Sequence, residues 1–197
     1  MDILFKHNEI IFDKELNELD KFVFDFVKIL EKHTDYIIVS GYVAILFGRA
    51  RATEDIDITI PKFSKEKFIE FHKAVVEKGY WFLNAESMGE LYSLLETKHS
   101  VRIAKQGKAI PNFEIRFVKS DSDLESFKNK IKVNVSGNTI FTSPIELQIA
   151  YKEVMLGTNK DLADALHLRE LFKEHINKKL LENYIKFLRY NKEHGKY

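Results

Sequence analysis

The run Asp55-Ile56-Asp57-Ile58-Thr59-Ile60 constrains the fold of this 197-residue chain more than any other segment. Polar and apolar residues alternate strictly, which is the period of a β-strand, and Pro61 ends the run. Because successive side chains of a strand point to opposite faces, Asp55 and Asp57 leave the same face. Two neighbouring carboxylates repel each other unless a cation binds them, and oxygen ligands suit Mg²⁺ or Mn²⁺. The pattern therefore predicts a divalent-metal site, although on an exposed strand the two acids would be ordinary solvated residues.

A second pattern precedes this strand. The β-rich run 36–39 ends in Ser40-Gly41, and residues 42–47 indicate a short helix that ends at Gly48. The N–H groups at the start of such a helix would attract a phosphate, Gly41 would allow close backbone approach, and the Ser40 hydroxyl could bind a phosphate oxygen. By itself, Ser-Gly after a strand is a common turn. Because the acid pair follows soon afterwards, the two patterns together predict a phosphate site beside a metal site.

The remaining elements of the first part of the chain are expected from apolar spacing and turn residues. The spacing predicts helices over residues 13–33, with Asp13 as the N-cap, over 64–78 and over 86–97. Four strands are expected, at residues 100–104, 113–118, 131–135 and 139–141, and Ser136-Gly137-Asn138 joins the last two as a hairpin turn.

The run Ser143-Pro144-Ile145-Glu146 carries the signals of a helix start, with Ser143 as the N-cap and Pro144 as the first helical residue. From there to the end the pattern is helical, with breaks near Gly157 and Asn177. The sequence thus predicts an α+β core over residues 1–142 and a C-terminal helical region over residues 143–197.

Composition excludes several classes of protein. Without Cys, the chain can form no disulfide, cysteine-ligated zinc site or thiol nucleophile. No apolar run approaches the roughly 20 residues that span a bilayer, and residues 1–7 lack the features of a signal peptide. The sequence contains no P-loop, Gly-x-Gly-x-x-Gly, His-Glu-x-x-His or nucleophile-elbow motif. We therefore expect a cytoplasmic protein without membrane contact.

The charge is divided unevenly along the chain. Residues 1–97 hold 12 Lys and Arg against 18 Asp and Glu, whereas residues 98–197 hold 19 against 12. This division fits a site that uses carboxylates on one side and contacts phosphates on the other, and it equally fits a chance difference between two solvated surfaces. Nine basic and four acidic residues in the segment 98–132 modestly favour an RNA partner.

From Ser40 to Ile58 the sequence resembles the nucleotidyltransferase superfamily related to DNA polymerase β. The signature of that superfamily is an apolar residue, Gly, then Gly or Ser, a short spacer, and Asp-x-Asp or Asp-x-Glu on a strand. Here Ser40-Gly41 stands where Gly-Gly or Gly-Ser is usual. Within the superfamily the run is similar to the AbiEii/MenT-type toxins of toxin–antitoxin systems. The resemblance implies a mixed β-sheet flanked by helices, and two Mg²⁺ or Mn²⁺ ions held by Asp55, Asp57 and a third carboxylate.

Glu114, in the apolar surroundings of Phe113-Glu114-Ile115, best matches that third carboxylate. Asp is commoner at this place in the family, and the longer Glu would change the metal geometry. The alternative is that Glu114 forms a cross-strand pair on the surface. Asp121 and Asp123 are poorer candidates because we expect them in a loop.

Two basic residues, Arg49 and Arg51, come just before the acid pair. Arg51 matches the basic residue of the family pattern Arg-x-Thr-x-Asp-x-Asp, where a guanidinium could bind phosphate through two hydrogen bonds. The alternative for Arg51 is an ion pair with Glu54 or another surface acid.

The resemblance extends to the helical region, where the family has a Lys-bearing helix followed by Arg or Lys and Asp-x-x-Asp. It implies that Lys152 and Lys160 neutralise the charge of a triphosphate and that Asp164 acts close to the nucleotide or the acceptor. Lys152 could instead be an ordinary surface residue. As an acid in a first helical turn, Asp164 would be favoured by the helix dipole whatever its function.

These observations predict a metal-dependent nucleotidyltransferase that moves an NMP from an NTP such as ATP to an acceptor hydroxyl. The acceptor could be a tRNA end, a protein hydroxyl or a small molecule. The resemblance adds that the protein could be a toxin with a cognate antitoxin. The competing hypothesis is a catalytically silent module of the same fold that binds a nucleotide or a partner protein.

Overall fold

The computed structural model describes residues 3–6 and 8–195, so Met1, Asp2 and His7 of the N-terminal stretch lie outside the described residues. Its centre is a mixed sheet with the order β1-β2-β8-β9-β3-β4-β7-β6-β5. The strands are β1 Ile3–Lys6, β2 Glu9–Phe12, β3 Ile37–Val39, β4 Asp55–Ile60, β5 Tyr80–Phe82, β6 Val101–Lys105, β7 Asn112–Phe117, β8 Ile131–Val135 and β9 Asn138–Thr142. This mixed sheet flanked by helices confirms the predicted α+β class.

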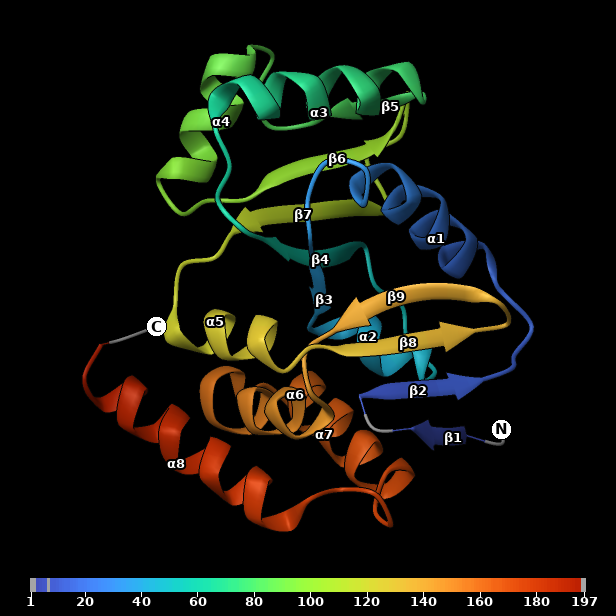
Figure 1. Cartoon of the computed structure of the whole chain (residues 1–197), viewed down its shortest axis with the longest axis vertical. Coiled ribbons are helices and arrows are strands. Elements are labelled where there is room, and N and C mark those ends of the chain that lie inside the picture. The colour runs from blue at the N-terminus through green and yellow to red at the C-terminus, as the bar shows by residue number, and fades with distance from the viewer. Residues whose placement is uncertain (1–2, 7, 196–197) are drawn as a thin grey trace.

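Helices cover the sheet and extend beyond it. They are α1 Glu18–Leu30, α2 Gly41–Leu46, α3 Lys65–Glu77, α4 Met88–Glu96, α5 Asp121–Lys128, α6 Ile145–Tyr151, the π-helical turn η1 Lys152–Leu156, α7 Asn159–Leu171 and α8 Lys178–Glu193. Figure 1 shows α3 and α4 at one end of the long axis, and α6, α7 and α8 at the other end. Among the described residues no helix is both long and apolar enough to cross a membrane.

The three central strands place the acid pair. Strand β3 runs antiparallel to β4, and β4 runs parallel to β7, so that Val39 and Glu114 lie on either side of Asp57. The apolar positions Ile56, Ile58 and Ile60 of β4 are buried, as the alternating pattern predicted. Because the apolar face is fixed in the core, the register of β4 and the direction of its two carboxylates are fixed as well.

Aromatic packing holds α1 against the sheet. The Phe113 ring of β7 stacks on Phe26 and Phe22 of α1, with ring centroids 4.0 and 4.4 Å apart. Tyr80 of β5 meets Phe26 at 5.2 Å in an edge-to-face contact. Such pairs stabilise a core beyond the burial of their area. This cluster anchors β7 directly beside Glu114.

Several predicted boundaries were wrong because long-range pairing displaced them. Helix α1 begins at Glu18 with a capping box between Asn17 and Asp20, and Asp13 is not its cap. The reason is that β2 extends to Phe12 and the backbone N–H of Lys14 bonds to Ser136 Oγ, which ties this connection to the β8–β9 hairpin.

Two further corrections concern the ends of helices. The N-cap of α6 is Pro144 rather than Ser143, since Gln148 N–H bonds to the Pro144 carbonyl and no side-chain cap forms. Asp121 and Asp123 lie in the first turn of α5 and not in a loop, because Ser120 and Asp123 form a capping box. The hairpin turn at Ser136-Gly137 was predicted correctly.

Candidate active site

The acids of β4 and β7 lie side by side in the sheet. Asp57 lies opposite Glu114 in the parallel pair, and Asp55 lies opposite Asn112. Burial and the negative charges of Asp55 and Glu114 together raise the pKa of Asp57 to about 6, against the opposing effects of the Ser40 hydroxyl and Arg116. A carboxylate with this environment binds a cation favourably, because the cation offsets the repulsion between the acids.

Glu114 is held by an arginine of the adjacent strand. Arg102 of β6 lies opposite Glu114, and its Nε and Nη2 both contact Oε1 of Glu114, at 2.7 and 2.6 Å. The cross-strand pair, which the sequence left as the alternative, is therefore present. Within residues 3–6 and 8–195, no three Asp, Glu or His side chains converge as a preformed metal site. The role of Glu114 as a third metal ligand stays a prediction.

The oxygen-only donor set nevertheless fits a divalent cation. Asp55 and Asp57 leave β4 on the same face, and Glu114 is next to Asp57 on β7. The two Arg102 contacts occupy only Oε1 of Glu114, and the Arg102 side chain is more than half exposed, so this pair can open. Carboxylate oxygens are the ligands that Mg²⁺ and Mn²⁺ prefer.

The turn after β3 has an unusual backbone. Ser40 has φ 65° and ψ −133°, a region that normally requires Gly. Its N–H donates to Oε1 of Gln148 at 3.2 Å, and its hydroxyl is hydrogen-bonded to Asp57. A Cβ at Gly41 would lie 2.0 Å from Nη2 of Arg51, so Gly41 is needed to admit the Arg51 guanidinium. In this structure the close approach predicted at Gly41 is made by an arginine.

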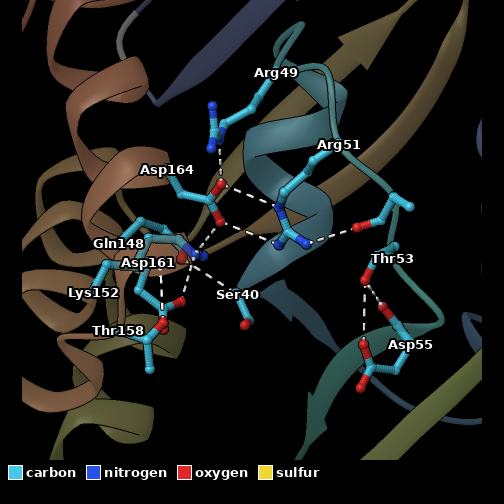
Figure 2. Close-up of polar contacts among 11 residues, drawn as sticks. Ser40, Arg49, Arg51, Thr53, Asp55, Gln148, Lys152, Thr158, Asp161 and Asp164 are labelled. Carbon is cyan, nitrogen blue, oxygen red and sulfur yellow. Dashed lines mark hydrogen bonds and ion pairs between the residues drawn. The ribbon is translucent and has the colours of Figure 1, made fainter.

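The basic residues of the site converge on Asp164, whose side chain is fully buried (Figure 2). Arg49 Nε lies 2.6 Å from Oδ1 of Asp164. Arg51 donates from Nε and Nη2 to the two oxygens, both at 3.1 Å, and Lys152 Nζ lies 2.9 Å from Oδ2. Burial would raise the pKa of Asp164, but the hydrogen bond and charge of Lys152 and the arginines hold it below its ordinary value.

Comparisons with solved structures identify the fold, whereas no protein-family model matches the sequence and a search of the curated proteins finds no relative. An antigenic nucleotidyltransferase-like protein from Paracoccidioides brasiliensis gives a TM-score of 0.52 at 14% identity, covering 87% of each chain. The complex of ANT(2″)-Ia with adenylyl-2″-tobramycin gives 0.53 at 14% identity, over 86% of this chain and 97% of that chain. The solution structure of ANT(2″)-Ia, an antibiotic-resistance factor, gives 0.52 at 14%, over 88% and 91%. This chain has a nucleotidyltransferase-like fold.

On this nucleotidyltransferase-like fold, the structure brings most of the predicted site residues into two groups. Asp55, Asp57 and Glu114 share the β4–β7 surface, and Ser40 joins them through its hydrogen bond to Asp57. The other group surrounds Asp164 and consists of Arg49, Arg51 and Lys152, with Gly41 packed against Arg51. Phosphate binding by these basic residues stays a prediction, since in this structure they contact Asp164.

Two placements differ from what the helical pattern suggested. Asp164 lies in the second turn of α7 and is buried among cations, so the helix dipole does not explain it. Lys152 is 1% exposed, which excludes the alternative of an ordinary surface residue. Lys160, in contrast, is exposed in the first turn of α7.

A cavity of about 190 Å³ adjoins Asp57, and several of the residues that line it were not predicted. Asp57 and Ser40 form part of its wall, together with Gln148 and Arg116. Arg116 of β7 makes a bidentate pair with Asp123 of α5, both bonds at 2.7 Å. The spacing Ser120-x-x-Asp123, a capping signal, could have revealed α5. Gln148, which is 4% exposed and has an unpartnered Nε2, carried no local signal.

Replacing Ser40 by Gly is expected to raise the free energy of unfolding by up to about 1 kcal/mol. Gly relieves a backbone strain of about 1–3 kcal/mol, but it gains unfolded-chain entropy and loses the hydroxyl contact with Asp57. Ser40→Ala is the matched control, because it loses the hydroxyl and keeps the strain. Urea denaturation of both variants measures the difference. A Gly variant less stable than the Ala variant would show that the backbone at residue 40 is not strained.

Proposed function

We propose that this protein is a metal-dependent nucleotidyltransferase that moves an NMP from an NTP to an acceptor hydroxyl. The observation that carries the proposal is the position of Asp57. It lies between two further acids and lines a cavity beside the Ser40 turn, on a nucleotidyltransferase-like fold. We assign the core to residues 1–142 and the helical region to residues 143–197 as part of the same proposal.

Asp55, Asp57 and, after release from Arg102, Glu114 would hold Mg²⁺ or Mn²⁺, with two ions as the working proposal. Bound divalent ions supply charge stabilisation to the attacking oxygen and to the pyrophosphate leaving group. The residues of the chain contribute position: Ser40 orients the Asp57 carboxylate through its hydroxyl, and β4 fixes the direction of both Asp side chains. Most of the rate enhancement in such transfers comes from positioning and electrostatics.

The cavity beside Asp57 is the proposed place of the nucleotide. Its walls combine apolar side chains, Val39 and Leu147 among them, with polar groups such as Gln148 and Tyr151. This mixture suits a ligand with an apolar ring and several polar atoms. Ser40 and Asp57 are at the same wall, which would bring the α-phosphate of a bound NTP toward the acids.

The acceptor is a separate proposal. One structural neighbour, ANT(2″)-Ia, is in complex with adenylyl-2″-tobramycin, which favours a small-molecule hydroxyl as one candidate. The basic excess in residues 98–132 favours a tRNA end as the other. The sequence resemblance to AbiEii/MenT-type toxins supports a toxin role with a cognate antitoxin, and growth arrest relieved by Asp57→Ala would support it further.

A catalytically silent nucleotide-binding module is the second candidate. It is favoured by the ion pair that occupies Glu114 and by the Asp164 contacts that occupy Arg49, Arg51 and Lys152. Such a module would bind NTP without turnover on any acceptor.

One experiment separates the two candidates. Each of the four α-labelled NTPs is incubated with the protein and Mg²⁺ or Mn²⁺, and with total tRNA, cell protein or an aminoglycoside. The Asp55→Ala/Asp57→Ala variant is the control. Label that appears on one acceptor and is lost in the control supports the transferase and names its acceptor class. NTP binding without label on any acceptor would favour the silent module.

Replacing Arg102 by Gln is expected to tighten Mn²⁺ binding by about 1.4- to five-fold. An exposed ion pair contributes about 0.2–1 kcal/mol of stability. In the variant, Arg102 no longer competes with the metal for the Glu114 carboxylate. Lys105→Gln is the matched control, since Lys105 lies on the same strand and its Nζ contacts the Tyr80 ring instead of an acid. Titration followed by Mn²⁺ electron paramagnetic resonance measures both variants. Equal affinity in Arg102→Gln and wild type would show that Glu114 does not bind the metal.

A further inference from the structure

The cluster around Asp164 joins two parts of the chain that are far apart in sequence. Arg49 and Arg51 belong to the connection between α2 and β4, whereas Asp164 belongs to α7. The connection is exposed at Ala50 and Ala52, and at its far end the Glu54 carbonyl accepts hydrogen bonds from Asn112. The two arginine side chains, bound to a carboxylate inside the protein, hold the part of the connection that precedes Thr53.

Arg51 is held from three directions. Its Nε and Nη2 form a fork on Asp164, and its Nη1 donates to the carbonyl of Ala52 at 3.0 Å. On the third side it is packed against Gly41, where even a methyl group would collide with Nη2. A bidentate guanidinium–carboxylate pair fixes direction as well as distance, which a lysine at this position could not do.

The same connection ends at the acid pair. Thr53 Oγ1 lies 2.9 Å from the carbonyl of Asp55 and 3.2 Å from Oδ1 of its carboxylate. Figure 2 shows the two sets of contacts on this connection, those of Arg51 with Asp164 and those of Thr53 with Asp55. Thr53 belongs to the connection that the arginines hold in place. The position of the Asp55 carboxylate therefore depends on where this connection holds the Thr53 hydroxyl.

We propose that Asp164 is a positioning residue for Asp55: it clamps Arg49 and Arg51, and the clamped connection holds the Asp55 carboxylate through Thr53. The proposal rests on the proposed function, because it assumes that Asp55 binds the metal. It gives helix α7, in the C-terminal helical region, an effect on the metal site through the arginines and Thr53, without contact between Asp164 and the substrate. Groups that orient a metal ligand typically change metal affinity about 10- to 100-fold when they are removed.

The test compares Mn²⁺ affinity, without nucleotide, in the full chain and in three variants. Asp164→Asn keeps the size of the side chain and weakens the clamp, and Thr53→Val removes the hydroxyl at the other end without changing any charge. We expect both to weaken Mn²⁺ binding by about 10- to 100-fold. Asp161→Asn is the matched control: this acid is on the same helix and contacts Lys152 at 3.5 Å, and no contact joins it to the arginines in the described part of the chain. It is expected to bind Mn²⁺ as the wild type does.

The double variant Asp164→Asn/Thr53→Val identifies the path. If both residues act through one path, the double variant loses no more affinity than the more damaging single variant. Wild-type affinity in both single variants would overturn the proposal, and so would a loss in Asp164→Asn with none in Thr53→Val, which would indicate a charge effect. If Asp164→Asn fails to fold, Thr53→Val and Arg51→Lys decide the question. A wild-type protein that binds no Mn²⁺ would instead refute the metal-dependent function itself, and the proposal with it.

Discussion

The variant Asp57→Asn is expected to lose nucleotidyl transfer by roughly a thousandfold or more and to become more stable than the wild type at neutral pH without metal. The loss follows because the metal supplies several kcal/mol of charge stabilisation and each 1.36 kcal/mol is a factor of ten in rate. Asn keeps the shape of the side chain but removes the negative charge that the cation requires. Transfer of label from an NTP measures the first effect.

The gain in stability has a definite pH dependence. The pKa of Asp57 is about 6 in the folded protein and has an ordinary value of 3.8, so the folded state holds this proton more tightly than the unfolded state. The contribution of Asp57 to the free energy of unfolding is therefore fully present below about pH 3.8 and is lost as the pH rises through about 6. At 1.36 kcal/mol per pKa unit, the loss is at most about 3 kcal/mol. Asp57→Asn removes it, so the two proteins should differ little near pH 4 and most at pH 7.

Thermal unfolding in chelator at several pH values measures this difference. The control is Asp121→Asn, which removes the same charge from an exposed position of α5. It is expected to leave both transfer and the pH dependence unchanged. An Asp57→Asn variant less stable than the wild type at pH 7 would contradict the prediction. It would show that the Asp57 carboxylate stabilises the metal-free fold.

Replacing Asp20 by Ala is expected to lower the free energy of unfolding by about 3–5 kcal/mol, the usual cost of breaking a buried charge pair. Asp20 is fully buried, lies 2.9 Å from Lys14 Nζ, and accepts a hydrogen bond from Tyr42 Oη at 3.0 Å. It also accepts from the N–H of Asn17 in the capping box of α1. Ala would leave the buried Tyr42 hydroxyl without its acceptor and Lys14 without its charge partner, so that Nζ keeps the Leu46 carbonyl but no carboxylate.

Urea denaturation checks this prediction against two other variants. Glu18→Ala, which replaces an exposed acid in the same helical turn, should leave the free energy of unfolding close to that of the wild type. Tyr42→Phe removes one hydrogen bond and should cost about 1 kcal/mol. Because Tyr42 belongs to α2, which follows Ser40 directly, we also expect Asp20→Ala to weaken NTP binding. A cost for Asp20→Ala no larger than that for Glu18→Ala would contradict the buried-pair interpretation.

The acid pair shows how far local pattern reaches. The alternation at residues 55–60 predicted a strand with two acids on one face, and β4 has these features. The Ser40-Gly41 turn and the hairpin at Ser136-Gly137 were also predictable, because a short run of residues contains all the information that each requires. The spacing of apolar residues and the residue types of a turn are properties of neighbouring residues, so tertiary contacts do not change what they predict.

The N-terminal strands show where local pattern fails. Residues 3–12 carry no local pattern that predicted an element, yet β1 and β2 form there, because β2 pairs with β8 more than 120 residues later. Helix α1 starts later than predicted for the same reason, since the connection after β2 is tied to the hairpin. A strand that depends on a distant partner leaves little trace in its own sequence.

By itself, the sequence of this protein determined which acids and bases are available and which strand and turn carry the first of them. Only the tertiary structure decided which charge meets which: Arg102 on Glu114, both arginines and Lys152 on Asp164, and Lys14 with Tyr42 on Asp20. The physical reason is that sheet register and helix packing set these distances, often across more than a hundred residues. Charge pairing depends on separation in space, which a linear pattern does not contain.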